Sequence, residues 1–381
     1  MLLESIKLTN LLSFREAELK LRALNVLIGP NASGKSNLIA AIGLLKAAPE
    51  NIEAAIQRGG GVRQWIHRGT QPSGIAGAGI KTRIDLGRDE GPLSYSLLFY
   101  ENDLKPRLGE ELRSCKTDQE FFERTGNQSK IYRPQDQSYE ETKIEGSKSV
   151  FAAFRDPFDK TPITRTGQAL AAIEIFREFQ TGSASTARNG VVVGTQKRFL
   201  DDGGGNLGLV LQELDFRVTL ARLNEYLTRF WQDAEAVRFR IEGGIVQIYV
   251  KERGIEEPIP ALRLSDGTLK YLCLMAILLH PDPPPLICIE EPELGLHPDA
   301  LAIVADALRE AAEKCQLIVT THSEALVNAL SGEPESVVVC ERGADGGAGF
   351  RRLQSNDLDE WLAEYRLGEL WRKGEIGGNR W

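Results

Sequence analysis

The chain of 381 residues lacks several features that would place it in common classes of protein. No apolar run approaches the roughly 20 residues that a membrane-spanning helix needs, so we expect no insertion into a membrane. Residues 1–7 are typical of a strand and not of a signal peptide. The five cysteines are scattered and include no Cys-x-x-Cys pair, which excludes a zinc hook and a disulfide framework and favours the reducing cytoplasm.

Internal repeats and sustained heptads are also absent, which excludes a long coiled-coil arm. The formal net charge of −8 argues against nonspecific DNA binding by the whole surface. DNA stays a candidate partner through a local patch such as Lys197-Arg198 or Arg351-Arg352, although such pairs are usually solvated. The length allows one large domain or two ordinary ones with an ample core.

A glycine-containing loop is the first motif that carries chemistry. Residues 24–28 form a short, mainly apolar run, as in a buried parallel strand, and apolar residues at helical spacing follow from residue 35 to 45. This strand-to-helix context favours a phosphate-binding loop over a turn that matches by chance. The expected ATP-binding residues are Gly29, Pro30, Asn31, Ala32, Ser33, Gly34, Lys35, Ser36 and Asn37.

The residue types of this loop suit a nucleotide. Gly29 and Gly34 allow a close backbone approach that a Cβ would obstruct, so that amides and the helix N-terminus can surround the phosphates. We expect Lys35 to reach the β- and γ-phosphates as a catalytic group and the Ser36 hydroxyl to hold Mg²⁺.

An acidic pair follows a second apolar strand at residues 286–289. Carboxylates at the carboxyl end of a parallel strand point into the ligand crevice of an open α/β sheet. We therefore expect Glu290 to bind Mg²⁺ and Glu291 to orient or deprotonate the attacking water. An ordinary solvated acidic turn is the alternative, and it is our interpretation of Glu293.

His322 follows the next apolar strand, residues 316–320, and precedes a helical pattern. A lone histidine is more often structural, but its place at the ligand edge of the sheet favours a catalytic contact with the γ-phosphate. For His297 a subunit contact and simple helix initiation are equally good interpretations. We expect His67 and His280 to be structural.

Residues 264–268 (Leu-Ser-Asp-Gly-Thr) stand before an apolar helix at residues 269–279. Ser265 and Gly267 thus lie at a helix N-terminus, where an anion can bind, although a plain N-cap is the alternative. The segment, about twenty residues before the acidic strand, resembles the signature of ABC-type ATPases. That resemblance implies that Ser265 and Gly267 bind, in trans, the γ-phosphate held by a second subunit.

The Asp-Gly-Thr variant of this signature departs from the Leu-Ser-Gly-Gly-Gln of transporters and resembles the branch with RecF, SMC and OLD-type ATPases. Further segments resemble stand-alone bacterial ATPases of the RecF/SMC-like AAA group, namely residues 203–207, 290–298, 367–371 and 377–378. The sequence departs from the family's pattern at Glu290, where an aspartate is usual. The metal-side glutamine has three candidates, Gln135, Gln180 and Gln196.

The resemblance implies an α/β fold, a P-loop NTPase of the ABC-ATPase head type. Its mixed, mostly parallel sheet would be flanked by helices, with an antiparallel β section and an inserted, mainly helical lobe. We place the head in residues 1–100 and 236–381 and the lobe in residues 101–235. Within the lobe, the polar segment 101–149 is expected to be partly mobile.

Finer patterns predict individual elements. Antiparallel strands are expected at residues 80–86 and 93–100, helices at 151–178 and 206–230, and a hairpin at 237–250. The C-terminal tail holds Trp361, Trp371 and Trp381. It either packs back on the head or presents a surface to a partner.

The predicted function is Mg·ATP binding and hydrolysis at the interface of a homodimer that forms on ATP binding. In DNA maintenance, DNA repair or anti-phage defence, this switch would control DNA or a separately encoded nuclease. The alternative is the energising ATPase subunit of a membrane transporter, which the Asp-Gly-Thr signature and the long insertion disfavour. A small-molecule kinase would leave the signature, the acidic pair and the histidine without a role.

Overall fold

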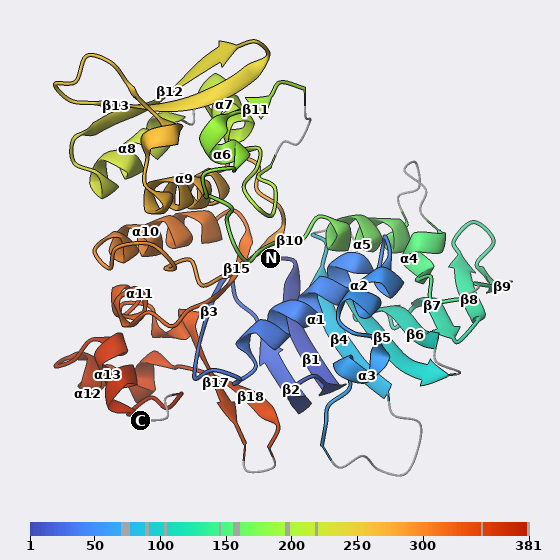
Figure 1. The fold of residues 1–381 in the computed structure, drawn as a ribbon. Helices are drawn as coiled ribbons and strands as arrows, with labels where there is room; N and C mark the ends of the chain where they lie inside the picture. The colour runs from blue at the N-terminus through green and yellow to red at the C-terminus, as the bar shows by residue number, and fades with distance from the viewer. Residues whose placement is uncertain are drawn as a thin grey trace. The chain divides into compact units, whose positions relative to one another are not determined.

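The computed structural model describes residues 1–69, 77–87, 91–102, 105–144, 146–154, 161–194, 199–217, 220–343 and 346–378. Gln196, Lys197, Arg198 and Trp381 lie outside the described residues. The chain divides into two compact units (Figure 1). The first comprises Met1–Glu174, Glu335–Gln354 and Gly374–Trp381, and the second comprises Ile175–Pro334 and Ser355–Lys373.

An antiparallel sheet of eight strands runs through the first unit in the order β2-β1-β4-β5-β6-β7-β8-β9 (Figure 1). The strands are β1 (Leu3–Leu11), β2 (Phe14–Lys20), β4 (Gly77–Asp85), β5 (Pro92–Asn102), β6 (Lys105–Ser114), β7 (Glu120–Thr125), β8 (Gln128–Arg133) and β9 (Ser138–Lys143). Their side chains alternate between a buried and an open face, so that Ile80 of β4 is buried and Lys81 is exposed. The predicted antiparallel pair is confirmed as β4 and β5.

A smaller group of strands in the same unit positions the glycine-containing loop. β3 (Leu24–Ile28) is buried at every residue and runs parallel to β17 (Val337–Arg342), and β18 (Ala348–Arg352) is antiparallel to β17. α1 (Lys35–Ala47) begins directly after the loop, as the strand-to-helix pattern predicts. The other helices of this unit are α2 (Ile52–Arg58), α3 (Val62–Trp65), α4 (Val150–Ala153) and α5 (Pro162–Ala171).

The polar segment 101–149 differs from the expectation of a mobile part of a helical lobe. It supplies β6 to β9 of the eight-stranded sheet, and α4, α5 and β10 (Glu174–Phe176) replace the single predicted helix at residues 151–178. Accordingly, the first unit runs to Glu174 and does not end near residue 100 as predicted.

A buried ion pair explains why so polar a segment is ordered. The side chains of Glu110 on β6 and Arg124 on β7 are 0% exposed and lie 3.2 Å apart. Glu110 accepts further hydrogen bonds from the Tyr95 hydroxyl, the Ser149 hydroxyl and the amide of Val150. Arg124 also donates to the backbone carbonyls of residues 126, 146 and 148. Every nitrogen of the guanidinium and both oxygens of the carboxylate therefore have hydrogen-bond partners, which is the condition for burying two charges.

The second unit contains the parallel strands β15 (Leu286–Glu290) and β16 (Gln316–Thr320), which pair in register. Its larger helices are α7 (Leu207–Phe216), α8 (Leu220–Phe230), α9 (Asp266–Leu278) and α10 (Ala300–Ala312). α9 is buried along most of its length, as its apolar sequence predicts, and Tyr271 on α9 stacks on Phe230 at 4.0 Å between ring centroids.

A small antiparallel sheet covers α7 and α8 in this unit (Figure 1). It is formed by β11 (Val191–Val192), β12 (Ala234–Glu242), β13 (Ile245–Glu252) and β14 (Ile259–Pro260), so the predicted hairpin at residues 237–250 is confirmed. The short elements along the chain are α6 (Thr186–Asn189), α11 (Glu324–Ala329), α12 (Asp359–Leu362), α13 (Leu367–Lys373), η1 (Ala261–Arg263), η2 (Pro334–Ser336) and η3 (Ser355–Asp357).

The C-terminal helix α13 packs against α11 of the same unit (Figure 1). A Cβ on Gly368 would lie 2.4 Å from the carbonyl oxygen of Glu324, so only glycine allows this approach. The Asn328 side chain and the Ser331 hydroxyl accept backbone hydrogen bonds from the start of α13. This part of the tail packs back on the protein, and it buries Trp371 while Trp361 stays exposed.

Removing one partner of the buried ion pair should destabilise the first unit strongly. We expect Arg124→Ala to lower the free energy of unfolding by about 3–5 kcal/mol, because Glu110 would be left buried and charged without its partner. Arg113→Ala is the control, because its ion pairs on the same sheet are partly exposed and their loss should change the free energy of unfolding much less. Urea unfolding of both variants measures the difference, and equal losses would contradict the role of the buried pair.

Candidate functional site

The loop between β3 and α1 needs its two glycines. Gly29 has φ 146°, and a Cβ there would lie 2.3 Å from the carbonyl oxygen of Cys340. Gly34 has φ 108° and is the N-cap of α1, with a Cβ position only 3.0 Å from Phe14 Cζ. No side chain caps α1 at this end, so its first amides face the loop without such a partner.

The polar groups of this loop suit an anion. Lys35 is 5% exposed, and its ammonium donates to the carbonyl oxygens of Gly29 at 2.7 Å and Pro30 at 3.1 Å. The hydroxyl of Ser33 is buried with no hydrogen-bond partner in the structure, which is rare unless a ligand or water completes the site. Uncapped amides, a cation and an unpartnered hydroxyl together form a cradle that a phosphate group would fill.

A hollow of about 440 Å³ lies beside this loop in the first unit. Its lining includes Ser13, Asn37, His67 and Arg342, and the Arg342 side chain donates to the carbonyl oxygen of Ala32 in the loop. Asn37 donates to the Ser13 hydroxyl at 2.9 Å. His67 Nδ1 lies 2.8 Å from the Leu12 carbonyl oxygen, a contact that agrees with the structural role predicted for this histidine.

In the second unit, Glu290 is the last residue of β15 and lies opposite Thr320 of β16. Its carboxylate forms an ion pair with Arg177 at 2.9 Å, a partner that the sequence did not indicate. The candidate glutamines Gln135 and Gln180 are exposed, and Gln135 lies in the turn between β8 and β9.

Glu291 adopts a left-handed backbone with φ 49°, which is uncommon for a residue other than glycine. Its amide donates to the carbonyl oxygen of Thr320 at 2.9 Å. The turned backbone brings its carboxylate to 3.7 Å from Nε2 of His322, so the two predicted catalytic side chains of this unit lie together. Backbone conformations of this kind are concentrated at functional sites.

Glu293 is not the solvated residue that we expected. One carboxylate oxygen accepts hydrogen bonds from the Thr321 hydroxyl at 2.8 Å and from the His322 amide at 2.7 Å. The other oxygen is buried without a partner. Burial raises the pKa of this carboxyl above its usual range. The sequence could have indicated this role only through the place of Glu293 three residues after Glu290. Its hydrogen-bond partners, Thr321 and His322, directly follow the next strand, β16.

The signature segment begins α9. The Ser265 hydroxyl accepts a hydrogen bond from the Thr268 amide at 3.1 Å, so the predicted N-cap is present. A Cβ on Gly267 would lie 2.7 Å from the carbonyl oxygen of Gly295, which brings the signature against the loop that follows the acidic pair. The neighbouring Leu262 and Leu294 are 58% and 55% exposed.

The remaining histidines behave differently from each other. His280 is buried and packs edge-on against Phe199, as expected for a structural residue. His297 is exposed and its Nδ1 lies 3.3 Å from the Asp299 amide before α10, which leaves both predicted interpretations in place.

Among the described residues, no three His, Cys, Asp or Glu side chains gather as a metal cluster. The hydroxyl of Ser36 and the carboxylate of Glu290 are the oxygen donors that Mg²⁺ prefers when phosphates supply the other ligands. In the part of the chain that the structure covers, no helix is long and apolar enough to span a membrane.

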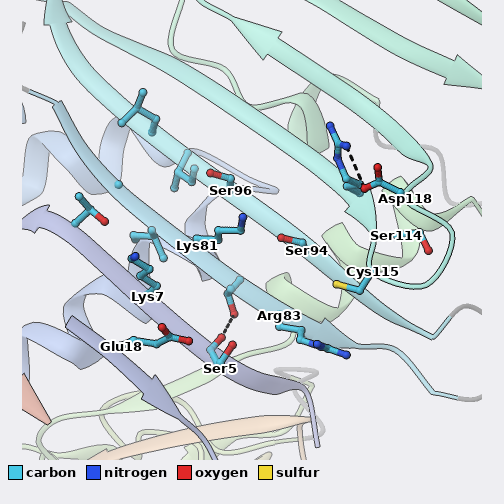
Figure 2. A pocket seen from close by; sticks show the side chains of 17 residues that line it. Ser5, Lys7, Glu18, Lys81, Arg83, Ser94, Ser96, Ser114, Cys115 and Asp118 are labelled. Carbon is cyan, nitrogen blue, oxygen red and sulfur yellow. Dashed lines mark hydrogen bonds and ion pairs between the residues drawn. The ribbon is translucent and has the colours of Figure 1, made fainter. Parts of the chain in front are cut away.

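A larger hollow of about 810 Å³ lies on the open face of the eight-stranded sheet (Figure 2). Its lining carries four basic side chains, Lys7, Lys81, Arg83 and Arg113, against two acidic ones, Glu18 and Asp118. Figure 2 shows Lys7 and Lys81 on neighbouring strands, and the strand register pairs them directly. No carboxylate of the described residues forms an ion pair with Lys81, whereas Lys7 pairs with Glu16 at 2.6 Å.

In the basic pair Arg351-Arg352, the second arginine is mostly buried and hydrogen-bonded. Arg352 donates to the carbonyl oxygens of Glu335 and Lys20 and to the Asn25 side chain. Burial lowers the pKa of its guanidinium to about 10. Arg352 therefore serves the packing of β18, whereas Arg351 stays exposed and pairs with Glu341 at 3.1 Å.

Comparison with known proteins gives a family and a fold. A family model described as "AAA domain, putative AbiEii toxin, Type IV TA system" matches residues 24–328. No curated protein matches the sequence significantly. The structure is similar to that of an SMC head bound to the C-terminal winged-helix domain of ScpA, with TM-score 0.60 and 13% identity over 94% of this chain and 99% of that chain.

Two further SMC heads give similar values. The head from Pyrococcus furiosus, with an extended coiled coil and the C-terminal domain of ScpA, has TM-score 0.58 and 14% identity over 95% of this chain and 99% of that chain. The head from Pyrococcus yayanosii, with a coiled coil and joint, has TM-score 0.54 and 13% identity over 95% and 99%. The fold is thus the predicted α/β fold of an SMC-type P-loop ATPase head.

The buried carboxyl of Glu293 predicts a pH dependence of stability. Because its pKa is raised in the folded state, the folded protein holds this proton more tightly than the unfolded chain does. The contribution of Glu293 to the free energy of unfolding is therefore present at low pH and is lost as pH rises through the raised pKa. Glu293→Gln removes this dependence, so the wild type should lose stability relative to the variant as pH rises above about 4.5.

Urea unfolding between pH 4.5 and 8 measures this difference. The exposed Glu257→Gln is the matched control for removing a carboxylate. A wild-type-minus-Glu293→Gln difference that does not change with pH would contradict the burial argument.

Proposed function

This chain belongs to that AAA-domain family and is an ATPase, and from this premise we propose that it works as an ATP-dependent dimerisation switch. In each site, the loop residues Gly29 to Asn37 bind the phosphates of ATP, with Lys35 on the β- and γ-phosphates. The hollow beside the loop offers room for the rest of the nucleotide. Mg²⁺, held by Ser36 and Glu290, neutralises phosphate charge when it is bound.

The contact between Glu291 and His322 carries the proposal for hydrolysis. Their side chains approach to 3.7 Å, and Glu293 anchors the backbone of His322. We assign Glu291 the role of orienting and deprotonating the attacking water, and His322 the contact with the γ-phosphate. A carboxylate beside a histidine can hold the proton that the water gives up.

The signature supports a second subunit in the site. Ser265 and Gly267 lie at the N-terminus of a long buried helix, where the helix dipole favours an anion. Two exposed leucines, Leu262 and Leu294, flank this segment and offer apolar contacts to a partner chain. The γ-phosphate held by one protomer would bind to these residues of the other, as in the family that the signature resembles.

The energetics of this arrangement suit a switch. A hydrogen bond to a charged group contributes about 1.5–3 kcal/mol, and two symmetric sites double the number of such bonds. ADP lacks the γ-phosphate that makes them, so hydrolysis returns the dimer to monomers. The two SMC heads solved with ScpA domains belong to proteins that bind a partner chain, and a separate partner is also the simplest effector for this one.

The Glu291→Gln variant tests the proposal. We expect turnover to fall by about 10²–10⁴-fold while ATP binding is retained, because only the general base is lost. Light scattering should then show a dimer with ATP·Mg²⁺ and a monomer with ADP. Lys35→Ala is the control, and it should lose nucleotide binding and dimerisation together. Wild-type turnover by Glu291→Gln would remove Glu291 from the mechanism, and a monomer in every condition would overturn the switch.

For the DNA-directed role we propose that duplex phosphates bind in the hollow on the open sheet face (Figure 2). Lysine and arginine side chains beside serine hydroxyls are the usual ligands of the DNA backbone. A basic surface of this kind supports a role in DNA maintenance, repair or defence, although the net charge of the whole chain is negative.

Lys81→Ala tests this surface. Removing one phosphate contact should weaken binding to duplex DNA and lower the slope of log affinity against log salt by about one. Lys130→Ala, an exposed lysine on β8 outside the hollow, is the matched control. Fluorescence anisotropy over a salt series measures both, and equal slopes for the two variants would exclude the hollow as the DNA site.

A further inference from the structure

An arginine whose side chain is largely buried, and that the proposed mechanism does not use, lies against the signature segment. Arg188 is on the short helix α6, and its side chain is only 9% exposed. Charged side chains are seldom buried to this extent unless hydrogen bonds satisfy them. The Arg188 guanidinium is satisfied in this way by backbone carbonyl oxygens and by one carboxylate.

The Arg188 guanidinium donates hydrogen bonds to the backbone of the segment that leads into α9. One terminal nitrogen donates to three carbonyl oxygens, those of Ala261 at 3.2 Å, Leu262 at 3.1 Å and Leu264 at 2.6 Å. Nε donates to the carbonyl oxygen of Thr181 at 3.0 Å. The first three carbonyls belong to η1 and to the residue before Ser265. The path of the chain into the signature therefore depends on Arg188.

The second terminal nitrogen accounts for the unusual residue of the signature. It lies 2.6 Å from the carboxylate of Asp266, which stands where transporter signatures have glycine. An uncompensated carboxylate in the first turn of α9 would repel an anion that approaches Ser265 and Gly267. Pairing with Arg188 compensates this charge, although the Asp266 side chain is itself 65% exposed.

The helix α6 that carries Arg188 is itself fixed by contacts within the second unit. The Thr186 hydroxyl of α6 donates to the carbonyl oxygen of Gly205 at 2.6 Å. A Cβ on Gly190 at the end of α6 would lie 2.9 Å from the carbonyl oxygen of Val246 on β13. The guanidinium thus projects from a fixed point of the second unit.

We infer that Arg188 is the positioning residue of the signature, which it holds in the shape that accepts the γ-phosphate of a partner protomer. The inference deepens the proposed dimerisation switch and rests on it for its effect on assembly. Lysine cannot replace arginine here, because one ammonium cannot reach carbonyls and a carboxylate that lie in several directions around a planar guanidinium.

The test uses the Glu291→Gln background, in which the proposed ATP-bound dimer accumulates. We expect the added Arg188→Ala to raise the dimer dissociation constant with ATP·Mg²⁺ at least about tenfold, which corresponds to about 1.4 kcal/mol. Binding of ATP to the monomer, measured by calorimetry, should change less than about twofold, because the phosphate loop lies in the other unit. With Arg188→Lys, the dimer dissociation constant should lie between those of the Glu291→Gln parent and of the protein with Arg188→Ala added.

Arg222→Ala is the matched control. This arginine also pairs with carboxylates of the second unit, but it lies on α8 and contacts Glu225 and Glu310 instead of the signature. An Arg188→Ala protein that dimerises as tightly as the Glu291→Gln parent would overturn the inference.

Hydrogen exchange separates this inference from the switch itself. In the nucleotide-free protein, Arg188→Ala should speed amide exchange in residues 261–268 relative to Arg222→Ala. Should Glu291→Gln fail to dimerise with ATP, the switch is wrong, and the exchange of this segment still decides whether Arg188 anchors it. Unchanged exchange would refute the anchoring, and Arg188→Lys takes the place of the alanine variant if the latter does not fold.

Discussion

The parallel pairing of β15 with β16 is the constraint on which the candidate catalytic residues of the second unit depend. Both strands end at one edge, so Glu290 lies opposite Thr320 and the residues that follow each strand become neighbours. The Glu291 amide adds one more hydrogen bond to Thr320 before the backbone turns. Glu293 then joins the two chain ends through Thr321 and His322. A carboxylate, a histidine and a buried carboxyl are thus brought together by one pair of strands.

The strands and helices that hold the site could be predicted because they are buried on all sides. β3, β15 and β16 appear in the sequence as short, mainly apolar runs, and α9 as a longer one. The loop after β3 was equally predictable, because its glycines and lysine stand between a strand and a helix at the spacing of a phosphate-binding loop. The contact of Gly29 with the Cys340 carbonyl, which lies far away in the chain, could not be predicted in this way.

The segment 105–143 could not be predicted in this way. Its strands face solvent on one side, and the buried pair that orders it joins Glu110 to Arg124 and to a turn near residue 149. A sequence pattern shows only that these residues are polar, whereas their partners depend on the register of several strands. For the same reason the sequence did not reveal the contacts of Arg177 with Glu290, of Arg188 with Asp266 and of Glu293 with Thr321, which join residues 28 or more positions apart in the chain.

The close contact between Gly267 and the Gly295 carbonyl has a consequence for how two active sites communicate. It joins the signature helix to the loop that leaves the acidic pair, so neither segment can shift without displacing the other. In the proposed symmetric dimer, each protomer's signature would serve the opposite nucleotide while its acidic pair would serve its own. Nucleotide binding at one site would then affect the other through the close approach of these two backbones, and the two hydrolysis events would be cooperative.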